Sequence, residues 1–316
     1  MPDRRCAGIY RNARRPFLLL SGRSRQDRPS RRHRLPLGAA LAAALFVVMA
    51  LASCGSGASS ETLTVAGSTT VLPIAEMAAE GFEGQTGTHV LVSGLGSSAG
   101  IEAVSNGTAD IATSSRDLTA EEASHELVAT VIAHDGIAVI VNPANGVSGL
   151  TTEQLRGIYA GRITNWSEVG GPDLAIQVVN RDEASGTREA FRSIVMDGSE
   201  FDRSAAVLPG TGQVRDVVSR TPGAIGYISI GFVESAYATT TVRALPIDGV
   251  EATEESVEDG SYPISRELYF FTNGDPQGTS YDYISYVLSD GMDQVIRDAG
   301  YIPAYNSIPG RGEGSD

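Results

Sequence analysis

The sequence predicts an α/β fold with mainly parallel or mixed sheets, and two observations support this class. Short apolar runs typical of buried strands alternate with segments of helical period from about residue 61 onward. Turns rich in glycine, serine and threonine separate the two kinds of segment, and no tandem repeat of fixed period is visible. Ligands of such folds bind at the carboxyl ends of strands, where helices begin.

The expected elements follow one another along the chain, strand before helix. Strands are expected at 63–67, 89–94, 110–115, 129–142 (one strand or two), 175–181, 224–230 and 266–274. Helices are expected at 71–87, 99–107, 151–161, 185–196, 211–223 and 279–300. The acidic segment 250–261 is expected to be an exposed loop.

The N-terminal region is a predicted targeting segment. Residues 1–53 are interpreted as a leader and signal peptide, because basic residues precede an apolar run of the length of a signal-peptide core. That run ends in "LASC", which resembles a bacterial lipobox and predicts lipidation (palmitate) at Cys54. A plain cleaved signal and an uncleaved anchor are the alternatives. Residues 54–60 are an expected flexible linker, and 309–316 an expected disordered tail.

Composition argues against a nucleic-acid-binding surface and against a metal site built from cysteines. The first 53 residues contain 11 arginines and two acidic residues, which leaves a formal charge of −23 on the rest. A polybasic surface for nucleic acid is therefore not expected. The chain has no lysine, so every cationic side chain after the leader, apart from a protonated histidine, is a guanidinium. Cys6 and Cys54 are the only cysteines, so neither a disulfide nor a cysteine metal site is expected in the body of the protein.

Four strand-to-turn joints carry hydroxyl residues, and two of them also carry an arginine. They are "AGSTT" (66–70), "GLGSSAG" (94–100), "TSSRDLT" (113–119) and "NRDEASGTREAF" (180–191). Each alone is an ordinary helix cap. Together they predict one concave anion site ringed by helix N-termini. The candidate residues are Ser68, Thr69, Thr70, Ser97, Ser98, Ser115, Arg116, Arg181, Ser185, Gly186 and Thr187.

These joints and two further stretches, "HDGIAVIVN" and "LRGIYAGRITNWSEVGG", occur in an order that resembles periplasmic phosphate-binding proteins. Those proteins are the extracytoplasmic receptors of the high-affinity phosphate importer of the ATP-binding-cassette (ABC) type. The resemblance runs from about residue 61 to about 305 and is greater to the shorter, lipoprotein branch of the family.

The resemblance implies a two-lobed periplasmic-binding-protein-like fold of type II, in which hinge strands join two mixed sheets flanked by helices. Residues 61–141 and 263–308 would form lobe 1, and 142–262 lobe 2. A dehydrated inorganic phosphate would lie in the cleft. The implied partner is the membrane permease of an ABC importer. A monomer without metal or cofactor is expected.

The resemblance also implies roles for residues. Thr69, Thr70 and Ser97 would bind phosphate from lobe 1, and Arg181, Ser185, Gly186 and Thr187 from lobe 2. Glu183 would orient Arg181. Arg116 stands where the longer branch of the family has an aspartate that accepts the phosphate proton. We therefore assign that role to Asp135 of "HDGIAV", which would disfavour sulfate; a simple turn aspartate is the alternative.

Other functions are weighed against this one. An enzyme is disfavoured because Ser185 is not in a nucleophile elbow, and because His89, His125 and His134 have no metal-ligand spacing. A receptor for another tetrahedral oxyanion, such as sulfate or molybdate, is an alternative. A phosphate sensor or adhesin on the same fold is another.

Overall fold

The computed structural model describes residues 62–234, 241–305 and 308. The predicted leader and signal peptide, the lipidation site Cys54, the linker 54–60 and the tail 309–316 lie outside the described residues. In the described part of the chain, no helix combines the length and the apolar character needed to cross a membrane.

The fold is a mixed α/β structure, as predicted, built on a curled sheet in the order β2-β1-β3-β9-β4-β7-β5-β6. The strands are β1 (Thr62–Gly67), β2 (His89–Gly94), β3 (Ile111–Ser114), β4 (Leu127–Val141), β5 (Gln177–Arg181), β6 (Ala206–Leu208), β7 (Ala224–Ser229), β8 (Arg243–Leu245), β9 (Ser265–Asn273) and β10 (Ile302–Pro303). Strands β1, β2 and β3 pair in parallel, as do β5, β6 and β7. The strands β4 and β9 between these groups run antiparallel to their neighbours.

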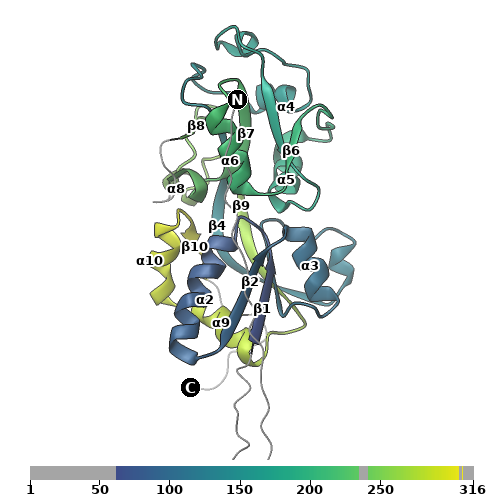
Figure 1. Ribbon diagram of the computed structural model, residues 1–316, viewed down its shortest axis with the longest axis vertical. Coiled ribbons are helices and arrows are strands. Elements are labelled where there is room, and N and C mark those ends of the chain that lie inside the picture. Colours follow the sequence, from purple (N-terminus) through teal and green to yellow (C-terminus); the bar gives the residue numbers. More distant parts are fainter. Residues whose placement is uncertain (1–61, 235–240, 306–307, 309–316) are drawn as a thin grey trace, which may run out of the picture. The chain divides into compact units, whose positions relative to one another are not determined.

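Strand β4 passes from one half of the sheet to the other (Figure 1). Its residues up to Gly136 pair with β9, and Ile137–Val141 pair with β7 and β8. The hydrophobic cores divide at the same place, since Ile132 and Ala133 belong to one cluster and Ile137 onward to another. We call the part with β1–β3 lobe 1 and the part with β5–β7 lobe 2. The two cores thus separate between Ala133 and Ile137 of β4.

Lobe 1 has helices on both faces of its sheet. Helices α2 (Leu72–Thr86), α9 (Gly278–Val287) and α10 (Asp290–Asp298) contribute to one buried cluster, in which the rings of Phe82 and Tyr283 meet edge to face at 5.5 Å. Helix α3 (Ser97–Ser105) packs on the other face against β3 and β9.

Lobe 2 is built around a stack of aromatic rings. Phe191 and Tyr227 lie 4.2 Å apart between centroids, and Tyr159 packs against both. The helices here are α4 (Thr152–Tyr159), α5 (Gly186–Phe191), which continues into a π-helical turn (Arg192–Met196), α6 (Thr211–Arg220), α7 (Gly231–Glu234) and α8 (Glu254–Glu258). Short 3₁₀ turns occur at Glu122–Ser124 and Trp166–Val169.

Two expectations about elements are settled by the structure. The run 129–142 forms the single strand β4 rather than two strands. The expectation of an exposed loop at 250–261 is wrong, because Thr253 caps α8 and Val257 is buried against the lobe 2 core. Acidic residues surround the two buried apolar side chains, Ala252 and Val257, and two apolar positions are too weak a periodic signal.

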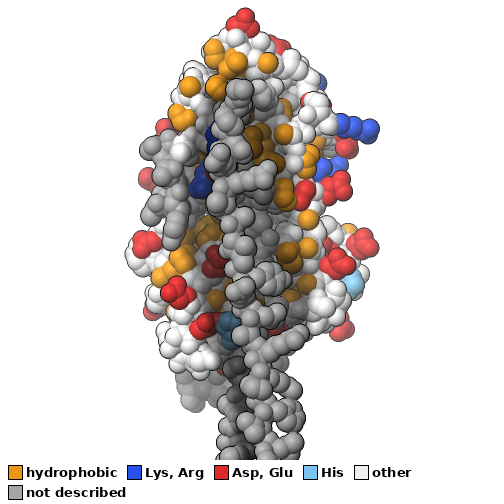
Figure 2. Space-filling view, viewed as in Figure 1, with side chains coloured by type: hydrophobic (Ala, Val, Ile, Leu, Met, Phe, Trp, Pro, Cys, Tyr) orange, Lys and Arg blue, Asp and Glu red, His pale blue; other side chains and the backbone are white. Residues whose placement is uncertain are grey.

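The acidic composition is visible on the described surface. On the face shown in Figure 2, acidic side chains are spread over both lobes, whereas basic ones appear at few points. Three arginines (Arg116, Arg181 and Arg266) are instead buried, each 9 % exposed or less. The cationic groups that matter for an anion are therefore interior ones.

Candidate functional site

Four α-helices begin where lobe 1 faces lobe 2. Helices α2 and α3 follow the parallel strands β1 and β2, and α5 and α6 follow the parallel strands β5 and β6. Three of these joints were predicted, and the joint that leads into α6 was missed. The predicted joint at 113–119 ends β3 but leads into a 3₁₀ turn rather than an α-helix. Backbone N–H groups at helix starts favour negative charge nearby.

Hydroxyl groups from both lobes meet at these helix starts. Thr70 Oγ1 lies 3.0 Å from Thr187 Oγ1, and Thr69 Oγ1 lies 3.0 Å from Thr211 Oγ1. In lobe 1 the Ser115 amide donates to Ser97 Oγ at 3.2 Å. We call Thr69, Thr70, Ser97, Ser115, Thr187 and Thr211 the hydroxyl ring; all but Thr69 are buried. Each hydroxyl has one rotatable proton, so the ring can direct neutral donors toward an anion.

Gly186 allows α5 to approach the hydroxyl ring. A Cβ at this position would lie 2.2 Å from Ser97 Oγ and 2.7 Å from Ser115 Oγ. Only glycine permits this approach between the two lobes. The neighbouring contact is a backbone one, in which the Ser98 amide donates to the carbonyl of Ala184 at 3.2 Å.

Three of the predicted serines have structural partners. Ser68 Oγ accepts from the amides of Thr70 and Val71 at the start of α2. Ser185 Oγ caps α5 by accepting from the Arg188 amide at 3.2 Å. Ser98 Oγ accepts from the guanidinium of Arg116 at 3.0 Å. These serines shape the turns that hold the ring.

Arg116 is also occupied. Its two terminal nitrogens donate to the two carboxylate oxygens of Glu122 at 2.6 and 2.7 Å, and Nη1 donates to the carbonyl of Asp117 at 2.7 Å. Burial alone would raise the pKa of Glu122, but hydrogen bonds from Arg116 and the Thr119 amide outweigh it and lower that pKa. These contacts occupy both terminal nitrogens of Arg116, and its role as an anion ligand stays a prediction.

Arg181 is held differently. It is 2 % exposed, donates to the carbonyls of Leu208 (3.2 Å) and Pro209 (2.7 Å), and reaches the hydroxyls of Thr211 and Thr69, each at 3.2 Å. Among the described residues it forms no ion pair with a carboxylate within 4.0 Å. Burial lowers the pKa of Arg181, against the opposing influence of Tyr227 and Asp182. A guanidinium nevertheless stays charged in proteins.

The expectation that Glu183 orients Arg181 is wrong. Glu183 is exposed, and the carbonyls of the turn after β6 hold the guanidinium instead. The adjacent Asp182 has a buried oxygen, Oδ1, which among the described residues is the one buried side-chain nitrogen or oxygen atom without a hydrogen-bond partner.

Asp135 has a partner that the sequence did not reveal. It is fully buried, and its Oδ2 accepts two hydrogen bonds from Arg266, at 2.9 and 2.7 Å. Its Oδ1 accepts from the hydroxyl of Ser229 at 2.6 Å. Burial raises the pKa of Asp135, and the charge of Arg266 opposes that rise. Both carboxylate oxygens are thus engaged by protein donors.

The two residues missed at this site differ in how they could have been found. Thr211 follows "LPG" at a strand-to-helix joint, so it carries the same signal as the four joints that were recognised. Arg266 lies inside a strand 131 residues from Asp135, and nothing in its local sequence marks it.

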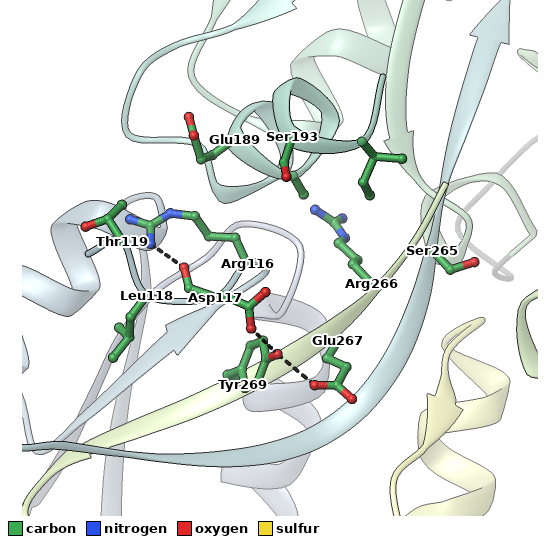
Figure 3. Close-up of a pocket in the computed structure, with 12 residues that line it drawn as sticks. Arg116, Asp117, Leu118, Thr119, Glu189, Ser193, Ser265, Arg266, Glu267 and Tyr269 are labelled. Carbon is green, nitrogen blue, oxygen red and sulfur yellow. Dashed lines mark hydrogen bonds between the residues drawn. The ribbon is translucent and has the colours of Figure 1, made fainter. Parts of the chain in front are cut away.

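A cavity of about 500 Å³ lies between the lobes, and no residue of the hydroxyl ring lines it (Figure 3). Its walls are formed in lobe 1 by the segment from Arg116 to Thr119, in lobe 2 by Glu189 and Ser193, and on β9 by Arg266 and Glu267. The hydroxyl of Tyr269 hydrogen-bonds to the carboxylates of both Asp117 and Glu267. Among the described residues, no three His, Cys, Asp or Glu side chains are grouped so that they could hold a metal ion.

The fold and the site define a class of protein, and comparison with known families gives the same class. A family model described as the PBP superfamily domain matches residues 52–291, so the chain is a member of that superfamily. The phosphate-binding protein PstS of Bacillus subtilis (strain 168) is 34 % identical over 255 residues, which cover 79 % of this chain and 83 % of the relative. PstS of Borreliella burgdorferi is 30 % identical over 261 residues (80 % and 93 %).

Solved structures give the same result. A putative phosphate ABC transporter substrate-binding protein of Clostridium perfringens, with bound phosphate, is 36 % identical with a TM-score of 0.73, over 77 % of this chain and 100 % of that one. An ABC-type phosphate transport receptor of Vibrio cholerae is also 36 % identical, with a TM-score of 0.65 and the same coverage. The chain belongs to the family of the phosphate-binding proteins PstS.

Proposed function

We propose that this protein is an extracytoplasmic receptor that binds inorganic phosphate and delivers it to the membrane permease of an ABC importer. The observation that carries the proposal is Arg181, a buried guanidinium without a carboxylate partner among the described residues. Buried charges in proteins are normally paired, so a protein that maintains this one gains from an anionic ligand.

The surroundings of Arg181 suit a dehydrated tetrahedral anion. Thr69 and Thr211 contact the guanidinium and also each other across the two lobes. Hydroxyls and helix starts supply donors without adding net positive charge, so a strongly acidic protein can still bind an anion inside. The surface charge acts from a distance and is screened by salt.

The same contacts support lobe closure on the ligand. The Thr70–Thr187 and Thr69–Thr211 contacts each join a residue of lobe 1 to one of lobe 2. An anion bound by both partners of such a pair favours the closed state, because an open protein offers it only half of the donors.

In this function the protein binds and releases phosphate and does not change it chemically. The hydroxyl of Ser185, the candidate nucleophile, caps α5. Relatives in the family are substrate-binding proteins of transporters by name. We further propose that the protein is a monomer tethered to the extracytoplasmic face of the membrane through a lipid on Cys54.

Calorimetric titration of the purified protein with phosphate, sulfate and molybdate tests this function. We expect phosphate to bind at least about a hundredfold more tightly than either competitor, a difference of about 2.7 kcal/mol. Tighter binding of sulfate or molybdate would instead identify a receptor for that oxyanion. No binding of any of the three would refute an anion receptor.

A further inference from the structure

A second buried arginine lies next to the hydroxyl ring, on a strand that joins the lobes. Arg266 belongs to β9, and its cross-strand neighbour on β4 is Asp135. Its Nε and Nη2 both donate to Asp135 Oδ2, and the side chain is only 4 % exposed. These two bonds fix the plane and direction of the guanidinium, because a guanidinium is rigid and planar.

The remaining donors of Arg266 point to the ring. Nη2 lies 3.3 Å from Thr70 Oγ1, and Nη1 donates to the carbonyl of Ser115 at 3.2 Å. Thr70 in turn contacts Thr187 of lobe 2. Arg266 also lines the cavity between the lobes, and in Figure 3 its guanidinium points toward the segment that carries Ser193. It therefore contacts residues of the hydroxyl ring and also lines that cavity.

We infer that Arg266 is a second guanidinium ligand of the anion and that Asp135 is the residue that positions it. This inference rests on the proposed function. Arg181 approaches from lobe 2 and Arg266 from the hinge strands, so an anion between the two arginines is held from two directions. Forked donors suit the oxygens of phosphate.

The charges fit this arrangement. Asp135 compensates the charge of Arg266, and no described carboxylate forms an ion pair with Arg181. The two guanidiniums and the one carboxylate therefore have a net charge of about +1, which suits an anion whose charge lies between −1 and −2 at neutral pH. Two uncompensated guanidiniums side by side would repel one another in a protein without ligand.

The location of the pair connects the ligand with the hinge. Asp135 accepts from Ser229 at the end of β7 in lobe 2, while Arg266 reaches Thr70 and Ser115 in lobe 1. An anion on Arg266 thus contacts a group that is fixed to both lobes through β4 and β9. Substituting Asp135 or Arg266 is expected to weaken the binding of every tetrahedral anion. The pair holds the two lobes in place around any such anion and does not make a contact that selects one of them.

This role for Asp135 differs from proton acceptance. Both of its oxygens accept hydrogen bonds from protein groups, and Arg266 lies between it and the hydroxyl ring. A positioning residue changes phosphate and sulfate affinity together. A proton acceptor changes their ratio, because sulfate has no proton to donate.

The test compares Arg266→Gln with the double variant Asp135→Asn/Arg266→Gln. The single variant leaves a buried carboxylate without its cation, so both the melting temperature and the phosphate affinity should fall. The double variant leaves no unpaired charge. Its melting temperature should return close to that of the wild type, while phosphate should still bind at least about tenfold more weakly. The surface pair Arg192→Gln/Glu200→Gln is the matched control and should change neither value.

The outcomes distinguish Arg266 as an anion ligand from Arg266 as a purely structural residue. A double variant that regains both stability and wild-type phosphate affinity would show that Arg266 is only structural. A wild type that does not bind phosphate would overturn the proposed function itself. If the double variant does not fold, Arg266→Lys is measured instead. Phosphate affinity at least about threefold weaker than that of the wild type supports a guanidinium ligand with forked donors, and unchanged phosphate affinity overturns the inference. For Asp135→Asn, a phosphate-to-sulfate affinity ratio that shifts about tenfold or more would return the proton-acceptor role to Asp135.

Discussion

The two buried arginines of the cleft differ in what balances their charge. Arg266 has Asp135 as a partner at 2.7 Å, with both residues at most 4 % exposed at the side chain. Arg181 is equally buried, but its contacts are two backbone carbonyls and two hydroxyls. The first arrangement is complete within the protein. The second has no carboxylate partner among the described residues, so its charge is balanced only when an anion binds, and this makes Arg181 the stronger sign of the function.

The comparison also shows how the fold supports each arginine. Arg266 and Asp135 face each other across β9 and β4, where strand pairing fixes their separation. Arg181 ends β5, and its guanidinium is held by the turn between β6 and α6. Hinge strands thus carry the charge-balanced pair, while a strand end and a turn carry the arginine that has no carboxylate partner among the described residues.

The largest expected effect comes from breaking the complete pair. Asp135→Ala leaves Arg266 as an uncompensated buried charge, so the free energy of unfolding should fall by about 3–5 kcal/mol. Urea denaturation followed by circular dichroism measures this. A loss below about 1 kcal/mol would show that water or another carboxylate compensates Arg266.

A smaller effect is expected where the lobes approach one another. Gly186→Ala places a Cβ 2.2 Å from Ser97 Oγ, so the closed state should be destabilised and phosphate affinity should fall by about 1–3 kcal/mol. Gly84→Ala in α2, which has no atom within 4 Å of the new Cβ, is the matched control. Equal affinities of the two variants would contradict a closure that depends on Gly186.

A still smaller loss of phosphate affinity is expected when one hydroxyl that contacts Arg181 is removed. Thr211→Val deletes the group that contacts both Arg181 and Thr69, and phosphate affinity should fall by about 0.5–1.5 kcal/mol. Because Thr69 and Thr211 share one contact, the double variant Thr69→Val/Thr211→Val should lose less than the sum of the two single losses. Strict additivity in calorimetry would show that the two hydroxyls act separately.

Much of the site could be predicted from local sequence because each strand-to-helix joint is a local feature. The structure brings Thr69, Thr70, Ser97, Ser115 and Thr187 together with Arg181, as the spacing of the joints suggested. Thr211 shares that local pattern and was simply not recognised. Arg266 and Asp135 could not be paired, because their contact is created by strand register over 131 residues.

The partners of Arg181 and Arg116 are likewise set by how the chain folds and not by their neighbours in the sequence. Glu183 is near Arg181 in sequence, but the chain turns so that its side chain is exposed and the carbonyls after β6 take its place. Arg116 was interpreted as a possible ligand, and Glu122, six residues later, occupies its fork. Residue type and spacing do not show which carboxylate a guanidinium meets.

The smallest expected effect concerns that Arg116–Glu122 pair and appears only in acid. The pKa of Glu122 lies below its ordinary value of 4.5 in the folded protein. Its stabilising contribution is therefore present above pH 4.5 and is lost as pH falls through the lower, folded pKa. Glu122→Gln should flatten the acid side of a stability-against-pH curve by less than about 1 kcal/mol and leave phosphate binding unchanged at pH 7. An unaltered curve would mean that the pair does not contribute.

Among the described residues Arg181 has no ion-pair partner within 4.0 Å, so an anion should supply it, and one paired measurement tests this most directly. Phosphate affinity by calorimetry and the free energy of unfolding without phosphate are measured for the wild type, Arg181→Gln and the surface control Arg192→Gln. Arg181→Gln should bind phosphate at least about thirtyfold more weakly, about 2 kcal/mol, and should lose much less stability than a broken ion pair does, because removing a buried unpaired charge offsets the lost hydrogen bonds. An affinity equal to that of Arg192→Gln, or a variant that loses stability like a broken ion pair, would contradict the account.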